Sequence, residues 1–273
     1  MTSTDNGSEG APYEDVLWEC ADHVGVITLN RPGTRNALTH EMYAELERLV
    51  RAAPDTDVRC LVVTGSDPAF CSGDDVRQVM GGGEERASSP LPRSRTPRLT
   101  PAAEALLQCN IPIIAAVNGA AVGWGMELAL MADMRIVSER AKFGELFVLR
   151  GLVSDVAGLG RLSQLVGREM AAELLFTGDV IEARRAEEIG LVGRVVPHDE
   201  LLPTAMSLAA RIAANPPLAV RQLKVGLRKA LDPDWNALGE WVSASLAELF
   251  TTDDHREGAK AFLEKRQPVF RGS

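Results

Sequence analysis

The sequence is poor in the residue patterns that hold metals or disulfides. Its 273 residues include only four cysteines and four histidines, and neither set has the spacing of a zinc site or a disulfide framework. Free thiols in a reducing compartment are the default interpretation. We therefore expect a cytoplasmic protein without a metal site. The scattered residues are Cys20, Cys60, Cys71, Cys109, His23, His40, His198 and His255.

Motifs for nucleotide phosphates and activated serines are also absent. The sequence has no GxGxxG after a strand pattern, no P-loop and no GxSxG. No apolar run approaches the ~20 residues of a membrane helix, and the polar start of the chain has no signal-peptide pattern. The net charge of −9 and the pI of about 5.1 disfavour nucleic acid and anionic membranes as partners. A local basic pocket for an anionic substrate stays compatible with them.

What is present is a chain with 45% hydrophobic residues, enough for a sizeable core. Apolar runs predict strands in "DVLWEC", "HVGVITLN", "VRCLVVTG", "IPIIAAVNG" and "MRIVSE". The first two read as a hairpin around Ala21 and Asp22. Helices are predicted after Thr39, after Thr100-Pro101 and within "GMELALMAD". Strand–helix units thus fill residues 13–145 and helices fill 157–266, with a capping box at Thr251-x-x-Asp254. We expect disorder at 1–12 and a mobile loop at 81–98.

Two glycine-bearing loops each follow a buried strand, at residues 65–76 ("GSDPAFCSGDDV") and 117–130 ("VNGAAVGWGMELAL"). A strand–glycine–helix connection exposes backbone N–H groups at the start of a helix. Two such loops facing each other could hold one oxygen between two N–H donors, as an oxyanion hole does. Taken alone, each loop is more simply interpreted as an ordinary tight turn.

Five motifs together resemble the crotonase, or enoyl-CoA hydratase/isomerase, superfamily over residues 13–270. They are "NRP…RNAL", "AFCSGDDV", "IPIIAAVNGAAVGWGMELALMADMRI", "FTGDVIEARRAEEIGLVGRVV" and "TTDDHREGAKAFLEKRQPVF". The resemblance implies an α/β fold, a crotonase (ClpP-like) spiral of ββα units over 13–197. It also implies a helical C-terminal region over 198–273 that mediates trimerisation, giving a homotrimer or a dimer of trimers.

The resemblance also implies where an acyl-CoA would bind. The oxyanion donors would be the backbone N–H groups of Asp74 and Trp124, although the family commonly has glycine where Trp124 stands. Coenzyme A would lie against Arg35, Asn36, Ala37 and Leu38, with Lys265 reaching its phosphates. Coenzyme A would be part of the substrate, so we expect no separate cofactor.

The acidic residues depart from the hydratase pattern of the family. Glu127 matches the first of the two hydratase glutamates, but the slot of the second holds Phe147. Glu145 lies two residues early, which on a strand would put it about 6–7 Å away, so it is not taken as a replacement. Asp155, in "GLVSDVAGLG", resembles the aspartate of the dienoyl-CoA isomerase and epoxyphenylacetyl-CoA isomerase branches. It could also be only the N-cap of the helix that follows.

These residues predict an enzyme that acts on an unsaturated acyl-CoA through an enolate, with Glu127 and Asp155 as the catalytic proton-transfer groups. Double-bond isomerisation is slightly favoured over hydration. The alternatives are an acyl-CoA-binding protein with little or no catalysis, and a hydrolase or decarboxylase on the same fold.

Overall fold

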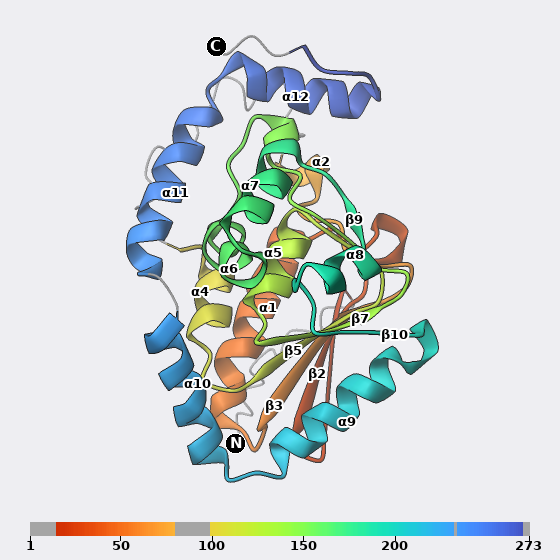
Figure 1. Cartoon of the computed structure of the whole chain (residues 1–273), viewed down its shortest axis with the longest axis vertical. Coiled ribbons are helices and arrows are strands. Elements are labelled where there is room, and N and C mark those ends of the chain that lie inside the picture. The colour runs from red at the N-terminus through yellow and green to blue at the C-terminus, as the bar shows by residue number, and fades with distance from the viewer. Residues whose placement is uncertain (1–14, 80–98, 232–233, 270–273) are drawn as a thin grey trace, which may run out of the picture.

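The computed structural model describes residues 15–79, 99–231 and 234–269 (Figure 1). The predictions for residues 1–12 and 81–98 fall outside these ranges. The described chain opens with the expected hairpin, β1 (Val16–Ala21) and β2 (Val24–Leu29), which pair in antiparallel. Asp22 and His23 form its turn at φ of 49° and 65°, the backbone that a two-residue hairpin turn requires.

Two sheets form the scaffold. The larger has the order β1-β2-β3-β5-β7-β10 and the smaller β4-β6-β8-β9. From β3 to β8 the chain alternates between them: each strand of the large sheet is followed by a strand of the small one, and helices follow each such pair of strands. This is the ββα spiral that the motifs predicted. The strands are β3 (Cys60–Gly65), β4 (Ala69–Cys71), β5 (Ile113–Val117), β6 (Ala120–Val122), β7 (Met134–Ser138), β8 (Lys142–Gly144), β9 (Ile181–Glu182) and β10 (Arg194–Val196).

The large sheet is covered on both faces, which is why β3 reads as an unbroken apolar run. Leu61 and Val63 belong to a core with α1 (His40–Ala52), α4 (Pro101–Gln108) and α5 (Trp124–Met131). Cys60 and Val62 point the other way, into a core with α9 (Leu201–Ala213). Figure 1 shows α9 lying along the sheet, apart from α1, α4 and α5.

The sequence predicted only helices over residues 157–266, and the structure corrects this prediction. Helices α6 (Val156–Val166), α7 (Arg168–Thr177) and α8 (Ala183–Glu188) are interrupted by β9 and followed by β10. These strands have two and three residues, which is too short for a period of two to stand out. β10 nevertheless extends the large sheet by pairing in parallel with β7.

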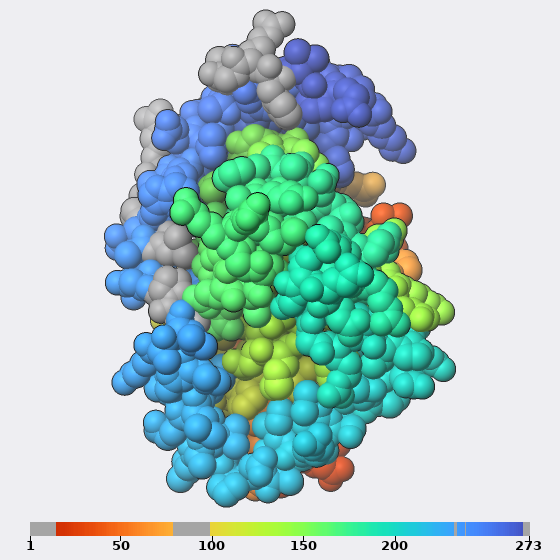
Figure 2. All heavy atoms as spheres, viewed as in Figure 1, coloured from red at the N-terminus to blue at the C-terminus, as the bar shows by residue number. Residues whose placement is uncertain are grey.

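The C-terminal helices form an arm along one long edge and one end of the molecule (Figure 2). They are α10 (Pro217–Leu231), α11 (Trp235–Leu249) and α12 (Asp253–Glu264). The N-cap of α12 is Thr252, whose hydroxyl accepts from the N–H of His255, so the box predicted at Thr251 is one residue off. None of the helices within the described ranges has the length and apolar character to cross a membrane.

Helix α12 packs on the short helix η3 (Val148–Arg150). The ring of His255 hydrogen-bonds the carbonyl oxygen of Arg150 at 2.8 Å, and the Arg150 guanidinium lies 4.5 Å from the ring centre of Phe262. The C-terminal arm therefore holds the turn that follows β8, a turn that also carries acidic residues of the candidate site.

Candidate active site

The two glycine loops that the sequence singled out meet in the structure. A Cβ on Gly73 would stand 3.1 Å from the carbonyl oxygen of Val122 and 3.3 Å from the backbone nitrogen of Trp124. Gly73 has φ +89° and Gly123 has φ +54°, a region that side chains disfavour. Glycine at both positions therefore allows the two loops to approach closely, and the loops are more than ordinary turns.

The predicted oxyanion donors lie at this junction. Trp124 is the first residue of α5, and the first N–H groups of a helix have no partner inside it. Asp74 follows Gly73, and its segment is fixed by hydrogen bonds from Leu38 N–H to Gly73 O and from Asp75 N–H to Leu38 O. The loops thus bring Gly73, the residue before Asp74, against the backbone nitrogen of Trp124. The role of the Asp74 and Trp124 N–H groups as an oxyanion hole stays a prediction.

The indole of Trp124 is buried, with 4% of its surface exposed. It meets the ring of Tyr43 edge to face, with 4.7 Å between the ring centres. The Tyr43 hydroxyl donates a 2.6 Å hydrogen bond to Asp74 Oδ1. Burial raises the pKa of the Tyr43 phenol well above its usual value, and the charges of Asp74 and Asp155 raise it further. Tyr43 therefore connects the two loops: its hydroxyl donates a hydrogen bond to Asp74, and its ring packs on Trp124.

Glu127 lies in the first turn of α5 and is fully buried. Its Oε2 accepts a 2.9 Å hydrogen bond from the N–H of Gly158, near the start of α6. Burial raises the pKa of Glu127 well above its usual value, and the neighbouring charges of Glu145 and Asp155 act in the same direction. A raised pKa brings a carboxyl closer to neutral pH, where it can both accept and release a proton, and this suits proton transfer.

Glu145 is brought to the same place, although the sequence interpretation had set it aside. Its side chain is 1% exposed, and Ser154 Oγ donates a 3.0 Å hydrogen bond to its Oε2. A Cβ on Gly158 would stand 2.6 Å from Glu127 Oε1 and 3.0 Å from Glu145 Oε1, so both oxygens border one small space. Burial raises the pKa of Glu145 to about 8.

The strand spacing of 6–7 Å does not apply to Glu145, because the chain is not a strand at that point. β8 ends at Gly144, and by Val148 the chain has turned into η3. The rule that residues two apart share a face at about 6–7 Å holds only while the strand continues. A usable signal would have been a glutamate next to a glycine at the end of a buried strand.

Asp155 is the N-cap of α6, as the second interpretation of this residue predicted. Its Oδ1 accepts from the N–H of Val156 at 2.8 Å. The residue is half-buried, and its charge raises the pKa of Glu127, Glu145 and Tyr43. Three carboxyl groups, those of Glu127, Glu145 and Asp155, thus lie at the start of α6. Asp155 belongs to this cluster even though it also caps the helix.

Two of the predicted coenzyme A residues contact the chain just before Asp74: the N–H of Ser72 donates to Arg35 O, and the N–H of Leu38 donates to Gly73 O. Asn36 is fully buried, and its side-chain amide donates to the carbonyl oxygens of Ser66 and Ala69 at 2.8 and 2.7 Å. Ala37 and Leu38 are also buried. The exposed side chains of the set are Arg35, at φ +55°, and Lys265, which ends α12 at φ +54°. Their role in binding coenzyme A stays a prediction.

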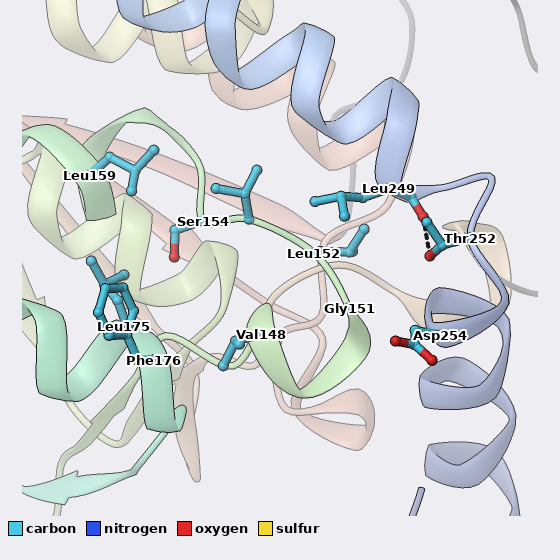
Figure 3. Close-up of a pocket in the computed structure, with 11 residues that line it drawn as sticks. Val148, Gly151, Leu152, Ser154, Leu159, Leu175, Phe176, Leu249, Thr252 and Asp254 are labelled. Atoms are coloured by element: carbon cyan, nitrogen blue, oxygen red, sulfur yellow. Dashed lines mark hydrogen bonds between the residues drawn. The ribbon is translucent and has the colours of Figure 1, made fainter. Parts of the chain in front are cut away.

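A largely apolar cavity of about 650 Å³ lies between α7 and the C-terminal arm (Figure 3). Leu175 and Phe176 of α7 line one side, and Leu249 with Thr252 lines the other. Ser154, which hydrogen-bonds Glu145, is also on its wall. Apolar space therefore adjoins the acidic groups. Across the described ranges, no three His, Cys, Asp or Glu side chains are grouped so as to hold a metal ion.

Comparison with known proteins gives this site a family. The model of the enoyl-CoA hydratase/isomerase family matches residues 19–273. The chain belongs to the enoyl-CoA hydratase/isomerase family. It is accordingly an enzyme of the hydratase/isomerase class, and its substrate class is the acyl-CoA thioesters.

Individual relatives of this family cover nearly the whole chain. A crotonyl-CoA hydratase of Syntrophomonas wolfei is 38% identical over 94% of this chain and 98% of its own length. A 2,3-dehydroadipyl-CoA hydratase of Escherichia coli is 36% identical over 90% of this chain and 94% of its own. The crystal structure of an enoyl-CoA hydratase/isomerase from Pseudoalteromonas atlantica superposes with a TM-score of 0.85 at 30% identity, covering 94% of this chain and 100% of that one.

Proposed function

We propose that the protein transfers protons on an unsaturated acyl-CoA and shifts its double bond. The observation that carries the proposal is the junction of the Asp74 and Trp124 loops next to a buried cluster of carboxyl groups. Loops that can bind a thioester oxygen, beside buried carboxyl groups whose pKa is raised toward neutral pH, are the two parts that enolate chemistry needs.

In this proposal the thioester oxygen lies between the N–H groups of Asp74 and Trp124. Glu127 removes the proton from the carbon next to the thioester carbonyl, and the C–H electron pair moves into an enolate whose oxygen the two N–H groups stabilise. The protonated form of Asp155 delivers its proton to the far carbon of the conjugated system, which places the double bond next to the carbonyl and leaves Asp155 ionised. Exchange of one proton with solvent then resets the two acids.

Hydration is the second candidate, and the position of Glu145 favours it. Two carboxyl groups commonly orient and split one water, and Glu127 with Glu145 supplies two such groups even though Phe147 fills the usual slot. The relatives named above as hydratases, acting on crotonyl-CoA and 2,3-dehydroadipyl-CoA, support this candidate.

The test supplies the enzyme with crotonyl-CoA, a 3-enoyl-CoA and a dienoyl-CoA and follows the products by mass spectrometry. The expected result is turnover of the 3-enoyl-CoA or dienoyl-CoA without a change in mass. A gain of one water on crotonyl-CoA makes hydration the activity. If a folded protein turns over none of them while calorimetry shows tight binding, the catalytic proposal fails and an acyl-CoA-binding role replaces it.

We also propose that copies of the chain assemble through the C-terminal arm into a trimer or a pair of trimers. Leu223, Leu227 and Leu231 follow one another at intervals of four residues on one face of α10 and are 60–67% exposed in the single chain. An exposed apolar stripe of this kind usually marks a contact surface. Light scattering of the purified protein tests this: a monomer at micromolar concentration contradicts it. The four cysteines are free, which supports the proposal of a cytoplasmic location.

A further inference from the structure

The buried glutamates Glu127 and Glu145 leave one oxygen each without a partner. Glu127 Oε2 accepts from the N–H of Gly158, and Glu145 Oε2 accepts from Ser154 Oγ. Within the part of the chain that is described, Oε1 of each residue is buried and has no hydrogen-bond partner. An orphaned buried acceptor is costly, so two of them side by side call for an explanation.

The same two oxygens border one space. The point where a Cβ on Gly158 would stand is 2.6 Å from Glu127 Oε1 and 3.0 Å from Glu145 Oε1. The separation of the two oxygens therefore cannot exceed the sum of these two distances. Glycine at this position leaves the space open. A proton in it would let one carboxyl donate to the other and would satisfy both orphaned oxygens at once.

The surroundings favour one negative charge on the pair and disfavour two. The N–H of Gly158 and the hydroxyl of Ser154 donate to it, and the start of α6 carries partial positive charge. Asp155, also at this helix start, raises the pKa of both glutamates when it is ionised, and its charge then opposes a second ionisation of the pair. Two carboxylates in one buried site cannot both ionise readily.

We propose that Glu127 and Glu145 hold one proton between their Oε1 atoms, and that Glu145 is thereby a positioning residue which prepares Glu127 to accept a proton from the substrate. A singly charged pair that takes up one proton becomes neutral, which removes a charge from a buried site. The C–H bond of the substrate breaks, an O–H bond forms on Glu127, and the electron pair stays on the enolate. This inference rests on the proposed function only for its last step.

The experiment titrates the carboxylic-acid C=O stretch by infrared spectroscopy in substrate-free protein. In the wild type we expect a protonated band that persists above pH 7. In Glu145→Gln the remaining acid, Glu127, loses its second negative neighbour and gains an amide donor. The midpoint of its titration should therefore fall by at least one pH unit. Glu127→Gln should shift the midpoint of Glu145 in the same direction, because coupling is reciprocal.

Two further variants complete the design. Ser154→Ala keeps both carboxyls and removes a donor to charged Glu145, so it should move the titration upward, and it serves if a glutamine variant fails to fold. Glu45→Gln changes a buried glutamate of α1 that pairs with Arg48, and should leave the band as in the wild type. A Glu127 midpoint that stays unchanged in Glu145→Gln, or a wild type without a protonated acid at pH 7, overturns the proposal.

Activity gives an independent readout. If the pair prepares Glu127, the acidic limb of the kcat profile moves to lower pH in Glu145→Gln, while KM changes less than threefold. A uniform loss of kcat at every pH would mean that Glu145 supports the fold and nothing more. A protein that shows the coupled titration but no turnover on enoyl-CoA leaves the pair standing and defeats the proposed function.

Discussion

Gly158→Ala tests the packing of the acidic groups. The added Cβ would stand 2.6 Å from Glu127 Oε1 and 3.0 Å from Glu145 Oε1, closer than real Cβ contacts. Forcing an extra carbon into a packed interior costs ~1–3 kcal/mol. Alanine in a helix regains ~0.5–1 kcal/mol over glycine, so we expect a net loss of roughly 0–2.5 kcal/mol with a midpoint of about 1 kcal/mol.

Urea unfolding followed by circular dichroism measures this change, with Gly226→Ala as the matched control. Gly226 is an exposed residue inside α10, and a Cβ there would meet nothing within 4 Å. That substitution should stabilise the protein by ~0.5–1 kcal/mol. The two glycine variants should therefore differ in sign. Equal stabilisation by both, with full activity in Gly158→Ala, would refute the crowding of Glu127 and Glu145 at this point.

Three further predictions concern the acids. Glu127→Gln should lower kcat on the accepted enoyl-CoA by two or more decades, with folding checked by circular dichroism; a tenfold loss or less contradicts a proton-transfer role. Asp155→Asn should keep the N-cap and so the stability, but lose activity if this acid moves a proton, whereas Asp155→Ala should also lose ~1 kcal/mol in denaturant titrations. The pKa of about 8 of Glu145 exceeds that of the unfolded chain, so the folded state keeps a proton that the unfolded state releases. The free energy of unfolding should then fall between pH 5 and 8 by about 1.4 kcal/mol per pH unit for this group, and Glu145→Gln should flatten that slope.

The parts of the fold that the sequence predicted are those with a strong local pattern. α1 begins after Thr39, whose hydroxyl accepts from the N–H of Met42, and β3 is the expected buried strand. β9 and β10 were missed because they have no strand pattern of their own. They are strands because they pair with β8 and β7, which are distant in the sequence. The ββα order itself came from the family motifs.

The candidate site divides in the same way. The meeting of the Gly73 and Gly123 loops follows from motifs that can be read along the chain, and the N-cap at Asp155 follows from the helix after it. The contact of Glu145 with Glu127 depends on where β8 ends and on the absence of a side chain at Gly158. Both depend on the tertiary structure and cannot be predicted from the spacing of residues along the sequence.

Uptake of solvent deuterium at the carbon next to the thioester carbonyl tests the central claim most directly. In D2O the wild type should place deuterium there on an accepted enoyl-CoA, as seen by mass spectrometry. Glu127→Gln should slow this exchange at least 100-fold, while Glu182→Gln, which changes an exposed partner of Lys142, should not. Exchange at the wild-type rate in folded Glu127→Gln, or no exchange by a wild type that binds the substrate, would contradict the account.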